Sequence, residues 1–232
     1  DWPDLYLDFS ALCFDHNSFA VGVDMLNAGL ARLPREPRLY LARGVLYAQL
    51  GQYREADADF SKAEELDPRE SAGADAKALA DFQADDLDAA LAKTREDIRR
   101  EPRNPFSYYL LAEILTRQGA RPGSPEFARA VASAKTAVRL KPDFSLAGDV
   151  LSRLYLESGD AKAAIAQCRA TLAADPSDQV AIYHLIRALR ASPASASSPE
   201  IEVLVKRLTV LRAQARQKDA QAGRYKLIEG NP

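Results

Sequence analysis

Five prolines return along the chain at a nearly constant distance, and this period constrains the fold more than any other feature of the sequence. The intervals between consecutive prolines are 34, 34, 40 and 34 residues. Each proline closes a segment of helical composition, such as AEELDP, AVRLKP or TLAADP. Because proline cannot continue a helix, each one marks the end of a structural unit. The prolines of the series are Pro34, Pro68, Pro102, Pro142 and Pro176.

Glycines at a fixed distance from the prolines divide the units in two. Gly51, Gly119 and Gly159 each lie 17 residues after the preceding proline of the series. Glycine accepts the left-handed backbone that often ends a helix. The one interval that is six residues longer has its extra residues inside ARPGSPEF, residues 120–127. The pattern predicts pairs of helices, each pair joined by a short turn.

Residues 37–70 show how such a pair would pack. Residues 37–50 carry apolar and small side chains at helical period, and Gly51 ends this helix. A second apolar stripe follows at three- and four-residue spacing, so that it faces the first helix. The stripe consists of Tyr53, Ala56, Phe60 and Ala63. A hairpin of this kind cannot bury its own apolar face, so it must stack on copies of itself.

This hairpin resembles the tetratricopeptide repeat, a helical hairpin of 34 residues. The aromatic, glycine, tyrosine, alanine, phenylalanine and proline columns of that family are occupied by Tyr40, Gly44, Tyr47, Ala56, Phe60 and Pro68. Arg43 stands where leucine is usual. The resemblance covers residues 3–222 in about five and a half to six repeats. It implies an all-α fold, a right-handed α-solenoid of antiparallel helix hairpins with a long C-terminal capping helix, and a non-catalytic role in protein binding.

The register extends over most of the chain as a single solenoid domain at residues 1–222. The weakest unit places Asp81 and Asp97 where apolar residues are usual, but its length preserves the register on both sides. The units lie at about 3–36, 37–70, 71–104, 105–144 with the six-residue insertion, 145–178, and 179–222 as a degenerate capping unit.

The last unit changes character after the low-complexity loop SPASASSP. Ser198 is a suitable N-cap and Pro199 a suitable first helical residue for a long helix at 199–222. One stripe of this helix is apolar, while Lys206, Arg207 and Arg212 make the other side basic. The stripe consists of Ile201, Leu204, Leu208, Leu211 and Ala215. We interpret the helix as a solenoid cap, with a dimerising coiled coil or a basic ligand face as alternatives, and residues 223–232 as a loose tail or a short docking segment.

The sequence predicts no enzyme and no cofactor or metal. His16 and His184 lie in different terminal units, and no nucleophile elbow, phosphate loop, zinc-protease pair or dinucleotide fingerprint is present. Adjacent Asp85 and Asp86 fall at a turn between helices, where solvated capping residues are expected. His16 is likewise expected in a turn, with the next helix capped by Asn17 or Ser18.

Composition sets further limits on partners and location. The chain has 232 residues, with 31 Lys plus Arg against 33 Asp plus Glu, so no global charge recruits nucleic acid. RNA-binding helical repeats are disfavoured for the same reason. No apolar run is long enough for a membrane span. Cys13 and Cys168 are predicted to be buried thiols. The chain begins with Asp1, so we expect a fragment or processed form, soluble, and either cytoplasmic or exported after loss of a targeting segment.

The expected binding surface is the concave face, which the first helices of stacked hairpins line. One column of that face runs through Leu7, Leu41, Asp75, Tyr109, Asp149 and Tyr183, and the next through Ala11, Val45, Leu79, Glu113, Arg153 and Arg187. The N-terminal half combines Asp4, Asp8 and Asp15 with apolar groups, and the C-terminal half gathers arginines around tyrosines. The pattern predicts a groove for an extended, acidic peptide. Its candidate ligand-binding residues are Tyr109, Arg117, Arg153, Tyr183, His184, Arg187 and Arg190.

Alternatives to this groove remain open at the level of sequence. The arginines could instead pair with neighbours such as Glu113, Asp149 and Glu157, and the aromatic rings could pack between helices. The lysine and asparagine clamp by which some members of the family hold a chaperone's C-terminal carboxylate is missing from the inner columns. The favoured function is a scaffold that binds a peptide or partner protein as a monomer or weak dimer. The alternative is self-association through the C-terminal helix.

Overall fold

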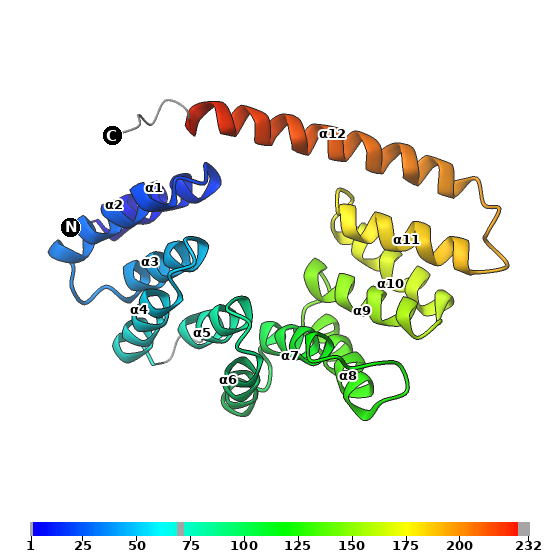
Figure 1. Ribbon diagram of the computed structural model, residues 1–232, viewed down its shortest axis with the longest axis horizontal. Coiled ribbons are helices and arrows are strands. Elements are labelled where there is room, and N and C mark those ends of the chain that lie inside the picture. Colours follow the sequence, from blue (N-terminus) through cyan, green and yellow to red (C-terminus); the bar gives the residue numbers. More distant parts are fainter. Residues whose placement is uncertain (1, 69–71, 227–232) are drawn as a thin grey trace. The chain divides into compact units, whose positions relative to one another are not determined.

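The protein is described by a computed structural model over residues 2–68 and 72–226, with side chains placed for these residues except 72–74, 218, 219 and 221–226. These residues form α-helices and turns, and no strand occurs among them (Figure 1). The helices are α1 (Pro3–Asp15), α2 (Phe19–Arg32), α3 (Pro37–Gln49), α4 (Tyr53–Leu66), α5 (Ala72–Gln83), α6 (Leu87–Arg100), α7 (Pro105–Arg117), α8 (Pro125–Leu140), α9 (Ser145–Glu157), α10 (Ala161–Ala174), α11 (Gln179–Ala191) and α12 (Glu200–Lys226). The prediction of an all-α fold is confirmed.

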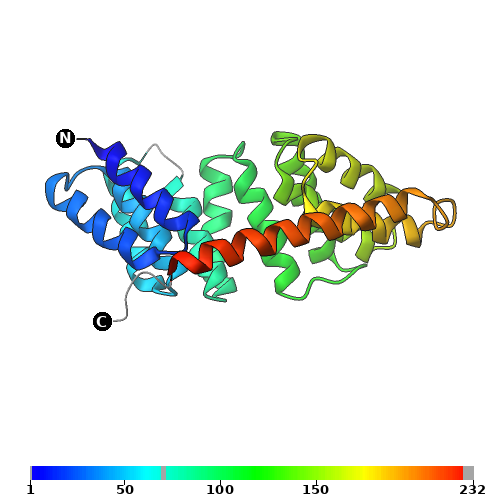
Figure 2. The same cartoon turned by 90° about the horizontal axis from the view of Figure 1, so that it is seen from above.

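The helices fall into two compact units. Helices α1–α6, with the end of α12 from Ala220, belong to unit 1, and α7–α11, with α12 as far as Asp219, belong to unit 2. Each helix from α1 to α5 packs on the next one in unit 1, and each helix from α7 to α10 does so in unit 2. First helices of successive hairpins also pack on each other, as α1 does on α3 and α9 on α11. Figure 2 shows the same helices from a second direction, with α12 in orange and red. The predicted hairpin packing is therefore confirmed, whereas the single domain over residues 1–222 stays a prediction.

The turn inside each of the first five hairpins, from α1–α2 to α9–α10, uses one left-handed residue at the same repeat position. Gly51, Gly119 and Gly159 have φ values of 74°, 91° and 79°. The two remaining hairpins place Asn17 and Asp85 there, with φ values of 54° and 65°. Asn and Asp are the residues other than glycine that best tolerate this conformation. The repeat turn is thus retained where the glycine is missing.

The residues that follow this turn start the second helices. Asp86 is the N-cap of α6, and its side chain accepts a hydrogen bond from the Ala89 amide at 3.1 Å. Ser18 occupies the N-cap of α2 without a side-chain cap bond. The prediction that Asp85 and Asp86 belong to a capped turn is confirmed, with Asp86 as the cap and Asp85 as the left-handed residue.

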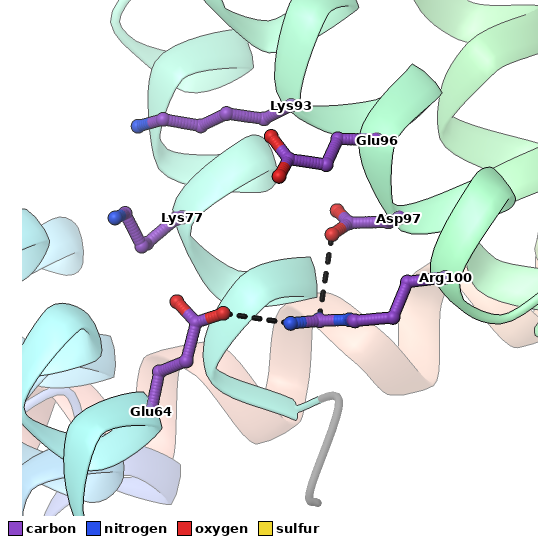
Figure 3. Close-up of a pocket in the computed structure, with 6 residues that line it drawn as sticks. All are labelled: Glu64, Lys77, Lys93, Glu96, Asp97 and Arg100. Carbon is purple, nitrogen blue, oxygen red and sulfur yellow. Dashed lines mark hydrogen bonds and ion pairs between the residues drawn. The ribbon is translucent and has the colours of Figure 1, made fainter. Parts of the chain in front are cut away.

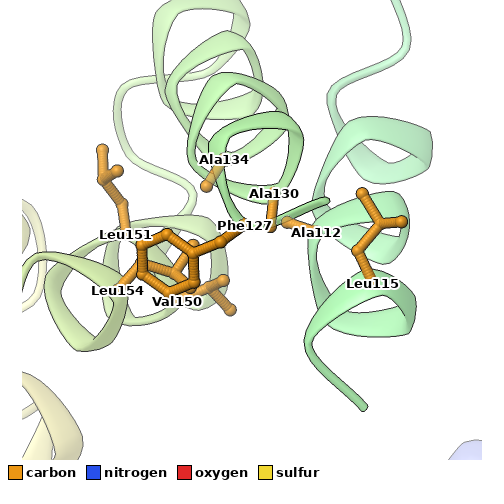
Figure 4. Packing of buried hydrophobic residues seen from close by; sticks show 8 residues of the cluster. All are labelled: Ala112, Leu115, Phe127, Ala130, Ala134, Val150, Leu151 and Leu154. Carbon is orange, nitrogen blue, oxygen red and sulfur yellow. The ribbon is translucent and has the colours of Figure 1, made fainter. Parts of the chain in front are cut away.

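The six-residue insertion lengthens both a loop and a helix. The loop of residues 118–124 separates α7 from α8, and α8 has 16 residues against 14 in α4. Ser124 caps α8 by accepting a hydrogen bond from the Phe127 amide at 3.1 Å. Phe127 then enters the core of unit 2, where it is 5% exposed (Figure 4). The cluster around it consists of Ala112, Leu115, Ala130, Ala134, Val150, Leu151 and Leu154.

Small residues mark the closest approaches of helices. At Gly44 of α3, an added Cβ would collide with the Phe60 ring of α4, and Ala56 is fully buried. The close packing of α3 on α4 therefore leaves room only for small residues at these two positions. Cys13 and Cys168 are both buried thiols outside any disulfide, as predicted, and burial raises the pKa of Cys168 to about 11.

The last helix is longer than predicted. It starts at Glu200, whose amide donates to the Ser198 hydroxyl at 3.3 Å, and it continues to Lys226 rather than to residue 222. Residues 223–226, the first four of the expected tail, are thus helical. The glycine at position 223 does not end the helix, because glycine in a helix is only about 1 kcal/mol less favourable than alanine. Residues 227–232 lie outside the described part. Leu204 and Leu208 are buried against Leu185 and Leu189 of α11, as a capping helix requires.

Candidate functional site

The first helices of unit 1 form an apolar hollow of about 550 Å³. Leu7 and Ala11 of α1 line one side, and Leu41 and Val45 of α3 line the other. These four residues are the first members of the two predicted columns, and the structure brings them together. Phe14, 40% exposed, stands at the same hollow and offers its ring to solvent. The hollow can accept an aliphatic or aromatic side chain.

Charged side chains surround this hollow. Arg38 lines it and makes exposed ion pairs with Glu36 at 2.8 Å and Asp4 at 3.0 Å. The pair with Arg38 lowers the pKa of Glu36. Asp15 also lines the hollow and is exposed. The hollow is therefore lined by one acidic and one basic side chain, and the basic one pairs with two further acids beside it.

In unit 2, α11 carries an exposed aromatic and cationic surface. Tyr183 is 44% exposed, and the Arg187 guanidinium lies 5.8 Å from the centroid of its ring. Arg190, one turn further along α11, is also exposed. Among the described residues, neither Arg187 nor Arg190 has an ion-pair partner. These two guanidinium groups remain available for an acidic ligand.

His184 lies beneath this surface rather than on it. The side chain is 6% exposed, and its Nδ1 has no hydrogen-bond partner. Burial, together with the charges of Arg187 and Arg153, lowers the pKa of His184 to about 4. The imidazole is consequently neutral at physiological pH, so it adds no charge to the α11 surface.

Other predicted site residues are occupied by contacts within unit 2. Arg153 of α9 pairs with Glu113 of α7 at 2.9 Å and with Glu157 at 3.4 Å. Tyr109 packs its ring against Phe106 and Phe144, with centroids 5.7 and 5.3 Å apart. The structure thus shows the pairing that the sequence left open as the alternative for Arg153. Arg117 is exposed at the end of α7.

A pair of half-buried carboxyl groups, Asp149 of α9 and Asp178 at the start of α11, lies where sequence reasoning did not place one. Asp178 caps α11 by accepting from the Val180 and Ala181 amides, each at 2.9 Å. Burial and the neighbouring Asp178 raise the pKa of Asp149 to about 7, and its Oδ1 has no partner. The sequence signal that could have predicted part of this pair is the position of Asp178, two residues after Pro176, where the N-cap of the next helix is expected.

A charged cavity of about 220 Å³ lies among α4, α5 and α6 (Figure 3). Arg100 bridges Glu64 at 2.7 Å and Asp97 at 3.5 Å. Asp97 is 7% exposed, and burial, followed by the charge of Asp75, raises its pKa to about 6. The cavity holds charges of both signs that largely pair within the unit. It is lined by Glu64, Lys77, Lys93, Glu96, Asp97 and Arg100.

The polar residues of the weakest repeat have partners in the same region. Lys93 of α6 reaches Asp81 of α5 at 2.7 Å and Asp57 of α4 at 3.1 Å. Asp81 therefore joins an ion-pair network where the family usually places an apolar residue. This network links three helices, which explains how the unit keeps its packing.

The described residues contain no group of three or more His, Cys, Asp or Glu side chains placed to hold a metal ion. Among the same residues, every helix is too short or too polar to traverse a lipid bilayer.

Comparison with known proteins places the fold. A family model described as "Tetratricopeptide repeat" matches residues 37–70. Tetratricopeptide repeat protein 16 of Mus musculus is 36% identical over 63 residues, which cover 27% of this chain and 8% of the mouse protein.

Solved structures extend the likeness over most of the chain. The C-terminal part of a TPR repeat-containing protein from Cytophaga hutchinsonii has a TM-score of 0.59 and 16% identity, covering 94% of this chain and 85% of that one. YrrB, described as a TPR protein with an unusual peptide-binding site, has a TM-score of 0.53 and 14% identity, covering 86% and 97%. Proteins of this fold are generally scaffolds for protein interaction. Residues 37–70 are a tetratricopeptide repeat, and the chain as a whole has the tetratricopeptide-repeat fold.

Proposed function

We propose that this protein binds a segment of a partner protein on the first helices of its hairpins. The apolar hollow on α1 and α3 is the observation that carries the proposal, because it presents apolar side chains from two helices with space for a side chain between them. YrrB, which shares the fold, is described as having a peptide-binding site, and this supports the class of ligand.

The surface on α11 favours acidic residues in such a ligand. Arg187 and Arg190 are exposed, and Tyr183 presents a ring that Arg187 already approaches. A carboxylate can accept hydrogen bonds from a guanidinium without breaking an ion pair of the protein. Arg153 is less available, because an incoming carboxylate would displace Glu113 or Glu157.

The first experiment tests the apolar hollow. Labelled peptides that share an acidic sequence and differ in one central residue, Leu, Phe or Ser, are titrated with the protein while fluorescence anisotropy is measured. We expect the Leu and Phe peptides to bind more tightly than the Ser peptide, and Ala11→Glu to remove this preference. Ala20→Glu, at an exposed position of α2, is the matched control. Equal affinity for all three peptides would rule out the hollow as an anchor site.

The second experiment tests the α11 surface separately. The Leu peptide is compared with versions whose Glu residues are replaced by Gln or Lys. We expect the acidic peptide to bind best, at least tenfold better than the Lys version, and Arg187→Glu/Arg190→Glu to reverse this order. Arg129→Glu/Arg139→Glu, at two exposed positions of α8, serves as the control with the same change in net charge. If the double substitution leaves the order unchanged, the acidic ligand is ruled out.

Self-association through the C-terminal helix remains the second candidate function. Val203 and Val210 on α12 are 65% and 54% exposed, on a different side from the buried Leu204 and Leu208. Light scattering over a concentration series tests this candidate, because a function in assembly requires the molar mass to rise with concentration.

A further inference from the structure

The N-terminal face of α1 is an uncovered copy of the interface that joins the repeats. Leu5 and Leu12 of α1 are 65% and 52% exposed. One repeat later, 34 residues along the chain, the same positions hold Leu39 and Leu46, which are 0% and 2% exposed. Leu39 and Leu46 pack against α2 in one cluster. Positions 5 and 12 therefore have the side chains for contact with a preceding helix.

The later hairpins follow the same rule. Residues at the repeat position of Leu5 are at most 1% exposed where the structure describes them, and those at the position of Leu12 are at most 3% exposed. The first group is Leu39, Ser107, Ala147 and Ala181, and the second is Leu46, Ala80, Ile114, Leu154 and Ala188. Within the two units, α3, α5, α9 and α11 each lie against the second helix of the hairpin before them. The missing neighbour of α1 is accordingly a helix.

The α1 face has a hollow and a charge that select the kind of helix. Trp2, 78% exposed, lies with Leu5 and Tyr6 at a cavity of about 200 Å³ that Leu33 and Arg32 also line. Asp8 is exposed between Leu5 and Leu12, and α1 contains no Lys or Arg. The α1 face thus offers two leucines seven residues apart, with an acidic residue, Asp8, three residues after the first leucine. A complementary helix has an apolar pair at the same spacing with basic residues between.

The chain itself contains such a helix. On α12, Val203 and Val210 are seven residues apart, and Lys206 and Arg207 stand at the third and fourth positions between them. Both valines are exposed, and so are both basic residues. Arg207 donates one hydrogen bond to the Pro176 carbonyl, and its other N–H groups can still reach a carboxylate. Lys206 pairs with Glu202 at 2.8 Å, but both side chains are about three-quarters exposed, and such a pair contributes little free energy. The side of α12 that meets α11 is different, because it uses Leu204 and Leu208.

We propose that α12 of one copy of the protein docks on the α1 face of a second copy. Val203 and Val210 pack against Leu5 and Leu12, and Lys206 and Arg207 pair with Asp8. The contact continues the helix-on-helix packing that joins the hairpins within each unit. Two α1 faces meeting each other would oppose Asp8 with Asp8, so charge favours the contact between unlike faces. Because the two surfaces differ, each copy can make this contact twice, once through each face, and the copies can therefore form an open chain, a closed ring or a dimer with two reciprocal contacts.

The experiment uses one variant for each face. Leu5→Glu/Leu12→Glu disables the α1 face, and Val203→Glu/Val210→Glu disables the α12 face. Leu146→Glu/Val180→Glu, at two positions that are 52% and 48% exposed, is the matched control. Circular dichroism melting checks that all three variants stay folded. Sedimentation velocity over a concentration series then gives the size of each protein alone and of equimolar mixtures.

We expect the wild type and the control to associate as the concentration rises, into a dimer or a larger species, and each face variant alone to stay monomeric. An equimolar mixture of the two face variants should form a dimer and nothing larger, because only one intact contact remains between them. A wild type that is monomeric at every concentration would overturn the proposal. So would a dimer that depends on the α1 face and not on α12, because that result would indicate contact between like faces.

A charge exchange tests the assigned pairs. Asp8→Lys should weaken the association, and Lys206→Glu/Arg207→Glu in the other copy should restore it. Restored association supports the pairing, and failure of every charge exchange to change association would overturn it. The proposal is independent of the peptide sites on α3 and α11. Peptide binding with no self-association, or the reverse, would therefore separate the two proposals.

Discussion

Asn17 and Asp85 occupy the left-handed turn position that glycine fills in three other hairpins. A side chain with a Cβ pays a conformational cost there that glycine does not, although Asn and Asp pay less than other residues. Both residues keep the turn, so the repeat geometry outweighs the local preference of the sequence.

Asn17→Gly should stabilise the protein. We expect a gain of about 0.5 kcal/mol, because glycine adopts the observed φ of 54° without steric cost. Thermal unfolding followed by circular dichroism measures the change. Ala20→Gly, in the first turn of α2, should lower stability by up to about 1 kcal/mol. An unchanged or lower melting temperature for Asn17→Gly would show that the asparagine side chain stabilises the turn.

Asp149 should make stability depend on pH. Its pKa is about 7 in the folded protein, against an ordinary value of 3.8, chiefly because of burial and then because of Asp178. The folded state therefore holds a proton that the unfolded chain releases between these values, so this group's contribution to stability falls as pH rises from about 4 to 7. Asp149→Asn should remove that fall, and its melting temperature relative to wild type should increase over this range.

His184 acts in the opposite direction and provides a contrast. Its pKa is lowered to about 4, chiefly by burial, so the unfolded chain binds a proton below about pH 6.5 that the folded state excludes. Its contribution is lost as pH falls towards 4. His184 is present in both the wild type and Asp149→Asn, so its effect cancels when the two proteins are compared. If their melting temperatures change in parallel with pH, the role given to Asp149 is contradicted.

Among the elements, α2, α3 and α4 are joined by one arginine. Arg43 donates two hydrogen bonds of 2.7 Å to the Asp59 carboxylate and one of 2.6 Å to Asn27. The rings of Tyr40 and Tyr47 lie 5.6 and 5.7 Å from its guanidinium carbon. Leucine is usual at the position of Arg43 in the family. Here the ion pair of Arg43 with Asp59 takes the place of the apolar contact that leucine would make.

A double-mutant cycle on Arg43 and Asp59 tests this replacement. Arg43→Leu alone should cost about 3 kcal/mol, because Asp59, 5% exposed, is left as a buried carboxylate without its cation. Arg43→Leu/Asp59→Leu should recover most of that loss, since apolar residues of similar size can replace a buried pair. Urea unfolding of the four proteins gives the coupling free energy. Additive losses would show that the two residues act independently.

For the whole molecule, the last helix closes the core of unit 2. Leu204 and Leu208 of α12 complete a cluster with Ile182, Leu185 and Leu189 of α11. Repeat proteins expose the apolar face of the last hairpin when nothing covers it, and terminal caps maintain their solubility.

Removal of residues 199–232 should therefore expose the α11 cluster. We expect the shortened chain to bind a hydrophobic dye and aggregate on concentration. Leu208→Ala in the full chain should give an intermediate result, with a loss of about 2–4 kcal/mol. Val210→Ala, at an exposed position, is the control. A shortened chain that stays monomeric and melts like the full chain would show that α12 is not a cap.

The sequence by itself determined the helix pairs, their turns and the residues between them. The proline period and the glycines 17 residues later are local signals, because they act on the backbone at their own position. Gly44 and Phe60 likewise follow from a spacing that repeats. The columns at Leu7, Leu41 and Val45 could be assigned before the structure because hairpin packing is the same from repeat to repeat.

Only the tertiary structure decided which charged side chains have partners and which stay available. Arg153 and Arg187 occupy the same column, yet Arg153 meets Glu113 and Glu157 while Arg187 lies beside Tyr183. The burial of His184 and the raised pKa of Asp149 depend on neighbours from other helices. Such contacts join residues that are distant in sequence, and long charged side chains choose among several neighbours at similar energy. A periodic sequence places the helices, but it leaves these choices to the packing.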